Sequence, residues 1–359
     1  MPIAKTALAR AEAFCKANDL RIPILLAPMA GACPPSLSIA VANAGGLGAC
    51  GALLMQPSAI KAWASDVRAG GNGGFQINLW IPDPAPTRDA AAEDAVRAFL
   101  RRWGPEVAAS AGDATPPDFS AQCEAMLDAG PSIISSIMGV YPPAFVAKMK
   151  ARGVKWFATA TTVAEAEQAE KAGADAIVAQ CAEAGGHRGA FDSAKAEAQA
   201  IGLFSLLPAI ADAVSVPVIA AGGVADARGV AAALILGAAA VQIGTGFLRC
   251  PEAKLPTAWA DAIGKTAPED TLVTRAFSGR PGRSIATAYL RAAMAKDAPP
   301  PAMYPVQRGL TQAMREAATR DNDIERMQAW AGQSARLAAA QPAADVARTL
   351  WDGARTLLE

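Results

Sequence analysis

The stretch VPVIAAGGVADARGVAAALILGAAAVQIGTGFL, residues 216–248, decides the fold of this chain. Two apolar runs, 216–223 and 240–248, flank a segment with apolar residues at helical spacing that ends in glycine. A continuous apolar run is typical of a strand buried on both faces, and a helical crossover makes two such strands parallel. The stretch therefore predicts one strand–helix–strand unit of an α/β protein.

The same alternation extends upstream through the chain. Six further apolar runs precede it, separated by alanine-rich amphipathic segments: 22–30, 46–54, 74–80, 131–139, 154–162 and 175–181. Eight buried strands with helical crossovers predict a (β/α)8 TIM barrel, which typically takes about 250 residues. An open, doubly wound sheet is the alternative.

Two regions interrupt the alternation. Residues 81–124 form an insertion rich in Pro, Asp and Ala, with a helix expected over 88–103, and the strands stop after residue 250. We therefore expect an α/β TIM barrel with an inserted and C-terminal, mostly helical lid domain. The barrel would comprise residues 1–80, 125–255 and 326–359, and the lid, which would contact substrate, residues 81–124 with 256–325.

Composition excludes several classes of function. The chain has 33 Lys and Arg against 33 Asp and Glu, so a basic surface for nucleic acid or an anionic membrane is not expected. No apolar stretch reaches the roughly 18 residues of a membrane span, and the N-terminus lacks a signal-peptide pattern, which predicts a cytoplasmic protein. Six scattered cysteines and one histidine give no metal site; the cysteines are expected to be buried small hydrophobes.

The segment GLGACG, residues 46–51, matches the spacing of a dinucleotide-binding loop. That loop follows a strand and opens a helix, whereas here a helical segment comes before the glycines. An acidic residue about 20 positions further on is also missing. We interpret these glycines as allowing the preceding helix to pack closely.

Glycine-rich segments end the last two strands, at 220–229 and 242–247. In a TIM barrel these two loops frequently bind phosphate through backbone N–H groups. Tight turns that need positive φ are the alternative explanation of the glycines. The residues expected to contact phosphate are Gly222, Gly223, Gly244 and Thr245.

Amide side chains end two other strands. Asn78 comes after the third strand and Gln180 lies on the sixth, while Ala27, Pro28 and Met29 follow the first. An amide both donates and accepts, so it can bind the N–H and C=O edge of a flat heterocycle. Each amide alone could equally make a core hydrogen bond, but together with the phosphate loops they fit flavin mononucleotide (FMN).

His187 is the one histidine of the chain, in AEAGGHRGAF, residues 182–191. It lies on the loop after the sixth strand, at the end where barrel enzymes carry out chemistry. Glycines beside it leave room for a ligand, and imidazole can hydrogen-bond an anion or take a proton. The alternative is an exposed loop histidine. Glu183 and Arg188 are expected to pair locally in this loop.

A second loop, SGRPGRS at 278–284, carries Arg280 and Arg283. These arginines could close over the flavin, although a solvated turn is an equal expectation. Tyr304 could face the active site from the lid or be an ordinary packed aromatic side chain.

Taken together, these motifs resemble those of the bacterial, FMN-containing nitronate monooxygenases. The resemblance covers nearly the whole chain after residue 20, and the insertion motif with the GGHRG loop is its most specific part. The matching segments are APMAG (27–31), GFQINLWIPDP (74–84), MGVYPP (138–143), ATATTVAEAE (158–167), QCAEAGGHRG (180–189), IAAGGV (219–224), QIGTGFL (242–248) and QAWAGQSARL (328–337).

The resemblance implies non-covalent FMN, no metal and no requirement for NAD(P)H. It implies oxidation of alkyl nitronates by dioxygen to a carbonyl compound and nitrite, with propionate 3-nitronate as the substrate class and detoxification as the role. His187 matches the family's catalytic histidine, as proton acceptor or as anchor of the anion. The FMN contacts it implies are Ala27, Pro28, Met29, Asn78, Gln180, Gly185, Gly222, Gly223, Gln242, Gly244 and Thr245.

Two alternatives stay open. One is another FMN-dependent barrel enzyme, an NAD(P)H:quinone reductase or a flavin-type enoyl-acyl-carrier-protein reductase, because such enzymes share the AGGH loop. The other is a flavin-binding protein without turnover. The oligomeric state and the physiological substrate do not follow from the sequence.

Overall fold

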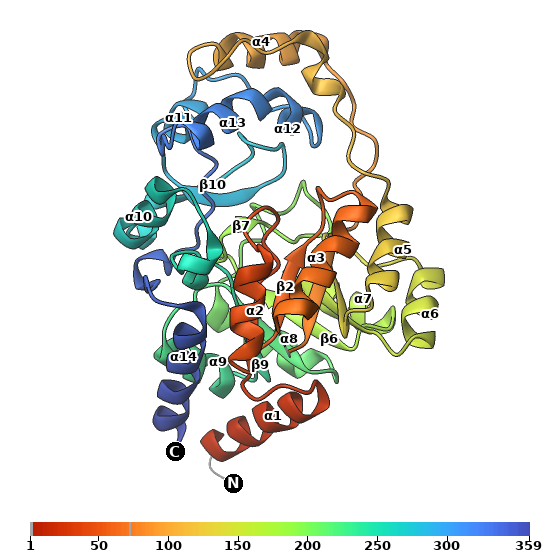
Figure 1. The fold of residues 1–359 in the computed structure, drawn as a ribbon. Coiled ribbons are helices and arrows are strands. Elements are labelled where there is room, and N and C mark those ends of the chain that lie inside the picture. The colour runs from red at the N-terminus through yellow and green to blue at the C-terminus, as the bar shows by residue number, and fades with distance from the viewer. Residues whose placement is uncertain (1–2, 72) are drawn as a thin grey trace.

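The eight expected strands close into a barrel. The computed structural model describes residues 3–71 and 73–359 (Figure 1). Its eight parallel strands run in the order β1-β9-β8-β6-β5-β4-β3-β2, and a bridge from Leu25 to Leu47 joins the first strand to the last. The TIM-barrel prediction is confirmed and the open sheet is wrong. The strands are β1 (Ile24–Leu26), β2 (Gly48–Gly51), β3 (Phe75–Trp80), β4 (Ile133–Ile137), β5 (Lys155–Ala160), β6 (Ala176–Gln180), β8 (Val218–Ala221) and β9 (Ala240–Ile243).

Helices cover the outer face of the barrel. Several begin at a side chain that accepts a hydrogen bond from the first turn: Asp226 accepts from the Gly229 N–H at 3.0 Å. Within the described residues, no helix combines the length and hydropathy that crossing a membrane requires. The ring consists of α2 (Pro35–Asn43), α3 (Pro57–Gly70), α5 (Phe119–Ala129), α6 (Pro143–Ala151), α7 (Val163–Lys171), α8 (Leu203–Ala213), α9 (Ala227–Ile235) and the C-terminal α14 (Ala343–Leu358), which packs on α9 and α2.

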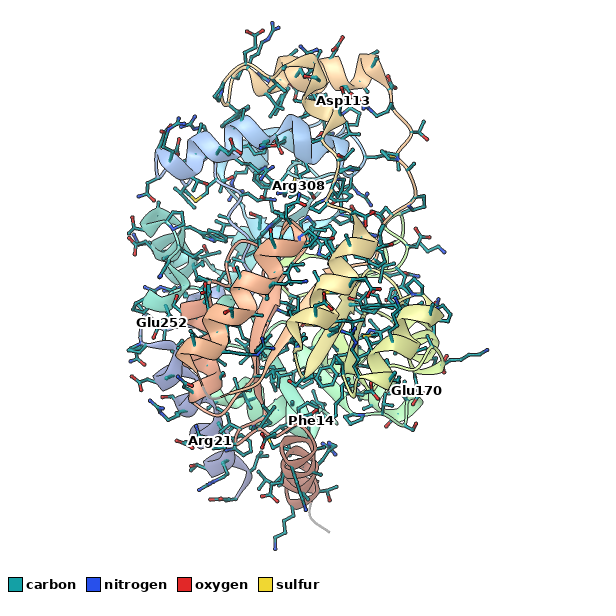
Figure 2. All side chains as sticks on the ribbon, turned by 45° about the vertical axis from the view of Figure 1, so that its right-hand side comes forward. Phe14, Arg21, Asp113, Glu170, Glu252 and Arg308 are labelled. Carbon is teal, nitrogen blue, oxygen red and sulfur yellow. The ribbon has the colours of Figure 1, made fainter. Side chains whose placement is uncertain are left out.

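The two ends of the barrel differ. Helix α1 (Ile3–Ala17) covers the end where the strands begin, and its Phe14 ring lies 6.1 Å from that of Phe157 inside a buried cluster. Figure 2 labels Phe14 at this end and Arg308 at the other, beneath the lid helices. The lower end is therefore filled by side chains, and a ligand site is left to the end where the strands finish.

A lid lies over that upper end (Figure 1). Helix α4 (Ala90–Leu100) and the later helices share an apolar cluster of their own, which includes Phe99, Tyr289 and Met314. A three-stranded antiparallel sheet, β10-β11-β7, ties the lid to the barrel. The other elements are α10 (Thr257–Lys265), α11 (Ala288–Ala293), α12 (Val306–Leu310), α13 (Gln312–Arg320), β7 (Gly186–His187), β10 (Thr271–Thr274) and β11 (Gly282–Ile285).

The expected domain boundary at 124/125 falls inside α5, which packs on α3 in the helix ring. The insertion therefore rejoins the barrel at the start of α5, near residue 119. The division into a barrel and a lid domain stays a prediction.

The glycines of the 46–51 segment pack against helix α2 and strand β1. A Cβ on Gly46 would lie 2.3 Å from the Ile24 carbonyl oxygen, and one on Gly48 would lie 2.9 Å from that of Ser38. Only glycine allows this approach, which supports the packing interpretation over a dinucleotide loop. All six cysteines are buried, as expected.

Candidate functional site

A cavity of about 360 Å³ lies where the barrel strands end. Every cofactor and catalytic residue predicted from the sequence lines it, although these residues are spread over more than 200 positions of the chain. They are Ala27, Pro28, Met29, Asn78, Gln180, Gly185, His187, Gly222, Gly223, Gln242, Gly244 and Thr245.

The loop after β8 is a glycine turn that lines the cavity. Gly222 and Gly223 both have positive φ, +101° and +70°. A Cβ on Gly222 would lie 2.6 Å from the Cys181 sulfur and 2.8 Å from Ala184. Both glycines line the cavity, and the close contacts leave no room for a side chain at Gly222.

Thr245 connects this loop region to the C-terminal part of the chain. Its hydroxyl accepts a hydrogen bond from the Gly332 N–H at 3.0 Å, and Gly332 and Ser334 also line the cavity. A Cβ on Gly185 would lie 2.5 Å from the Gly332 nitrogen. The Thr245 hydroxyl proton therefore stays available for a ligand. The close passage of the 331–334 segment explains why residue 185 is a glycine.

The Gln180 amide holds the histidine loop in place. Its Nε2 donates to the His187 carbonyl at 3.1 Å, and its Oε1 accepts from the Gly189 N–H at 2.7 Å. Asn78 donates to the Ser135 hydroxyl at 3.1 Å, which leaves its carbonyl oxygen free for a ligand. Both amides thus make local hydrogen bonds and still face the cavity.

His187 is enclosed by aromatic rings and positive charge. Its ring centroid lies 4.6 Å from that of Trp80 and 4.8 Å from that of Trp330, both edge to face. Burial is the first cause that lowers the pKa of His187, to about 3, and three positive charges contribute. The exposed-loop alternative is therefore wrong, and the ring is neutral at ordinary pH. The charges belong to Arg280, Arg308 and Arg315.

Ser278 orients the imidazole. Its hydroxyl oxygen lies 2.7 Å from His187 Nε2, accepts from the Arg280 N–H at 3.3 Å and lies 3.2 Å from the Arg280 carbonyl. One arrangement satisfies all three contacts: Ser278 donates to the carbonyl, and His187 Nε2–H donates to Ser278. Nδ1 then carries the lone pair, and it has no hydrogen-bond partner within the described residues.

Two lid arginines, which sequence reasoning missed, also line the cavity. Arg315 is held by Thr311 Oγ1 at 3.1 Å and by the Arg308 carbonyl at 2.9 Å. The Arg308 guanidinium makes no hydrogen bond or ion pair with any residue that the structure describes. The site is therefore electropositive, with a cation free to bind an anionic ligand. No motif marks these arginines, because helical segments of the lid carry them far along the chain.

The positions of the two arginines in the 278–284 loop match neither expectation, closure over the flavin or a solvated turn. Arg280 is 1% exposed and Arg283 is 8% exposed, so the turn is not solvated, and neither side chain lines the cavity. Arg280 pairs with Asp83 at 2.9 Å, which connects the insertion to the lid. Arg283 donates to the Ala182 carbonyl at 3.0 Å. Strand β11, which carries Arg283, pairs with β7, the strand that contains His187. Both arginines therefore hold the histidine loop without lining the cavity.

Three other expectations concern neighbours of the site. Tyr304 packs 5.4 Å from Trp80 and does not line the cavity, so it is a packed aromatic side chain. Glu183 accepts from the Leu203 N–H at 3.0 Å and Arg188 donates to the Cys181 carbonyl, without an ion pair between the two among the described residues. Within the same residues, no three His, Cys, Asp or Glu side chains are grouped as a metal would need.

Comparisons with known proteins agree with this geometry. The family model described as nitronate monooxygenase matches residues 13–353. A nitronate monooxygenase of Paraburkholderia phytofirmans is 37% identical over 334 residues, with 91% of each chain covered, and a probable nitronate monooxygenase of Staphylococcus aureus is 36% identical over 332 residues, 90% of this chain and 92% of that one.

Among solved structures, nitroalkane oxidase from Streptomyces ansochromogenes superimposes with a TM-score of 0.85 at 34% identity. The match covers 95% of this chain and 98% of that one. The protein is therefore an oxidoreductase, and it belongs to the nitronate monooxygenase family.

Proposed function

We propose that this enzyme binds FMN in the cavity and oxidises alkyl nitronates with dioxygen, giving a carbonyl compound and nitrite. Propionate 3-nitronate represents the substrate class, and removal of such toxic anions in the cytoplasm is the role. The observation that carries the proposal is one cavity lined by two glycine-rich loops, amide side chains, a histidine with a lowered pKa and an arginine that has no ion pair among the described residues.

The residues present fit FMN. Gly222 and Gly223 line the cavity without side chains, Thr245 retains a hydroxyl proton, and Gln242 presents an amide to the cavity. These groups would hold the phosphate and the polar edge of the ring system. Bound FMN would supply the electron acceptor that returns electrons to dioxygen.

The arginines suit an anionic substrate. A nitronate carries its charge on two oxygens, and a carboxylate-bearing nitronate has a second anionic group. Arg308 and Arg315 are the cationic donors of the cavity, and hydrogen bonds to charged groups are stronger than neutral ones. Burial lowers the pKa of Arg308, so an anion that pairs with it also relieves an unfavourable buried charge.

His187 would act at Nδ1 as a proton acceptor. A neutral nitroalkane must lose its α-proton before oxidation, and an unprotonated imidazole beside the reacting carbon can take it. A preformed nitronate needs no such step. Trp80 and Trp330 pack edge to face against the ring and hold its plane.

Anaerobic mixing tests the proposal. The purified protein should be yellow, release FMN on denaturation, and lose flavin absorbance within a turnover when propionate 3-nitronate is added. NADH should cause slow bleaching or none. Rapid bleaching by NADH with an inert nitronate would indicate one of the reductases instead. Bleaching by neither compound would indicate a flavin-binding protein without turnover.

A further inference from the structure

Strands β1 and β2 separate at the point where the barrel closes. The Leu26 N–H donates to the Leu47 carbonyl at 2.9 Å, and a continued parallel ladder would next pair the Ala49 N–H with the Leu26 carbonyl. Instead the Ala49 N–H donates to the Ser38 hydroxyl at 3.2 Å. We call this place the seam. It leaves the Leu26 carbonyl without a backbone donor.

Gln76 satisfies that carbonyl from inside the barrel. It lies on β3, two residues before Asn78, so the two side chains share the inner face of the strand. Its Nε2 donates to the Leu26 carbonyl at 3.2 Å and to Gln242 Oε1 at 3.0 Å. Gln76 is completely buried and does not line the cavity.

These two hydrogen bonds determine the orientation of a second amide. A carbonyl oxygen only accepts, so the Gln76 group that faces Leu26 must be the NH2. Its other hydrogen then points to Gln242, which must present its oxygen in return. Gln242 lines the cavity, and its NH2 has no partner within the described residues.

We propose that Gln76 is a positioning residue, which orients Gln242 so that the Gln242 NH2, and not its carbonyl oxygen, faces the cavity. The ligand chemistry that this favours is a carbonyl or ring-nitrogen acceptor. Gln76 thus makes one end of the site a hydrogen-bond donor, although it touches no ligand. The part of the inference that concerns FMN rests on the proposed function.

Side-chain amide NMR on ligand-free, 15N-glutamine-labelled protein tests the orientation without any flavin. The Gln242 signals are assigned as those that disappear from the spectrum of the Gln242→Met variant. In the wild type we expect Gln242 NH2 protons that exchange readily with solvent and Gln76 NH2 protons that are protected. Protected Gln242 protons would overturn the proposal, because they would show that its NH2 is turned inward.

FMN titrations test the consequence. Gln76→Met keeps a similar volume without hydrogen bonds, and we expect it to weaken FMN binding on the order of tenfold and to lower the midpoint potential. In a Gln242→Met background, Gln76→Met should change neither quantity further, because its effect acts through residue 242. Additive effects, or an unchanged dissociation constant in Gln76→Met, would overturn the proposal.

Ser38→Ala is the matched control at the same seam. Ser38 hydrogen-bonds Ala49 from the outside of the barrel and touches neither the cavity nor Gln242. The variant should lower the melting temperature but leave FMN affinity and potential unchanged. If the wild type binds no FMN, the proposed function fails, while the ligand-free NMR still decides the orientation of Gln242.

Discussion

The site combines an unprotonated histidine with nearby arginines, and the two kinds of residue suit different roles. In the function proposed above, the guanidinium groups of Arg308 and Arg315 would bind the anion and His187 Nδ1 would accept the proton. Burial, and after it the positive charges of Arg280, Arg308 and Arg315, lower the pKa of the ring and so keep it unprotonated.

The protonation state of His187 can be measured directly, because the chain has a single histidine. With its pKa lowered to about 3, the ring of the ligand-free protein should show no titration between pH 5 and 8 in 15N-detected NMR. The 15N chemical shifts of the His187 ring should correspond to the Nε2–H tautomer. Ser278→Ala should mix the tautomers, and a wild-type titration near pH 6.5 would contradict the description of the site.

His187→Asn separates the two roles of the ring. The loops proposed to hold FMN lie elsewhere, so the variant should bind FMN normally. Oxidation of a neutral nitroalkane should fall on the order of 10²- to 10⁴-fold, the usual effect of losing a general base. A preformed nitronate should be affected much less. Wild-type rates with both forms of substrate would mean that His187 is not catalytic.

Arg308→Met tests the anionic part of the substrate. We expect kcat/KM for propionate 3-nitronate to fall about 10- to 100-fold, as for loss of a hydrogen bond to a charged group. The value for propyl 1-nitronate, which has one anionic group, should fall less. Arg320→Met, on the exposed side of α13, is the control and should change neither value. An equal fall for both substrates would show that Arg308 does not bind the substrate carboxylate.

Residues could be predicted where a strand end places them. Asn78 and Gln180 lie near the ends of buried strands and Thr245 follows one, and the parallel barrel brings all such ends together. Arg308 and Trp330 could not be predicted, because they reach the cavity from segments late in the chain whose packing depends on tertiary contacts. Gln76 was missed for another reason: nothing in the sequence distinguishes a glutamine inside a barrel from one on its surface.

At the scale of elements, the turn after β8 gives a sharp test. Gly222→Ala adds a Cβ 2.6 Å from the Cys181 sulfur at a residue with φ +101°. We expect FMN binding to be lost, because the loop must shift to relieve the contact. Gly153→Ala is the matched control, since Gly153 has φ +67° but open space around it.

Both of these variants should lose about 1–2 kcal/mol of stability from left-handed strain alone. Gly153→Ala should keep its FMN, and urea unfolding with FMN titration would compare the two. Normal FMN binding in Gly222→Ala would show that the turn does not serve as the phosphate site.

The eight barrel strands were predictable because each is buried on both faces and so reads as a continuous apolar run. The sheet β10-β11-β7 was not, because β7 is the pair Gly186–His187. Two residues carry no periodicity, and this strand forms only because β11 of the lid pairs with it. The strand that positions the histidine is thus a product of tertiary structure.

At the scale of the whole molecule, α14 completes the helix ring after the chain has returned from the lid. Trp351→Ala should lower the free energy of unfolding by about 3–5 kcal/mol, because its ring is buried between α14 and its neighbours. Leu357→Ala, on the same helix but 59% exposed, should change stability by less than about 0.5 kcal/mol. Chemical denaturation measures both, and equal effects would contradict the packing of α14.

The order in which the cavity is lined has a consequence for biosynthesis. Its wall residues run from Ala27 to Ser334 of the chain, so the pocket is incomplete until residue 334 has been synthesised. A nascent chain can form individual strand–helix units as it emerges, but it has no closed pocket to offer a ligand. A chain truncated before Gly332 would lack Gly332 and Ser334 of the cavity wall and should not retain a ligand there.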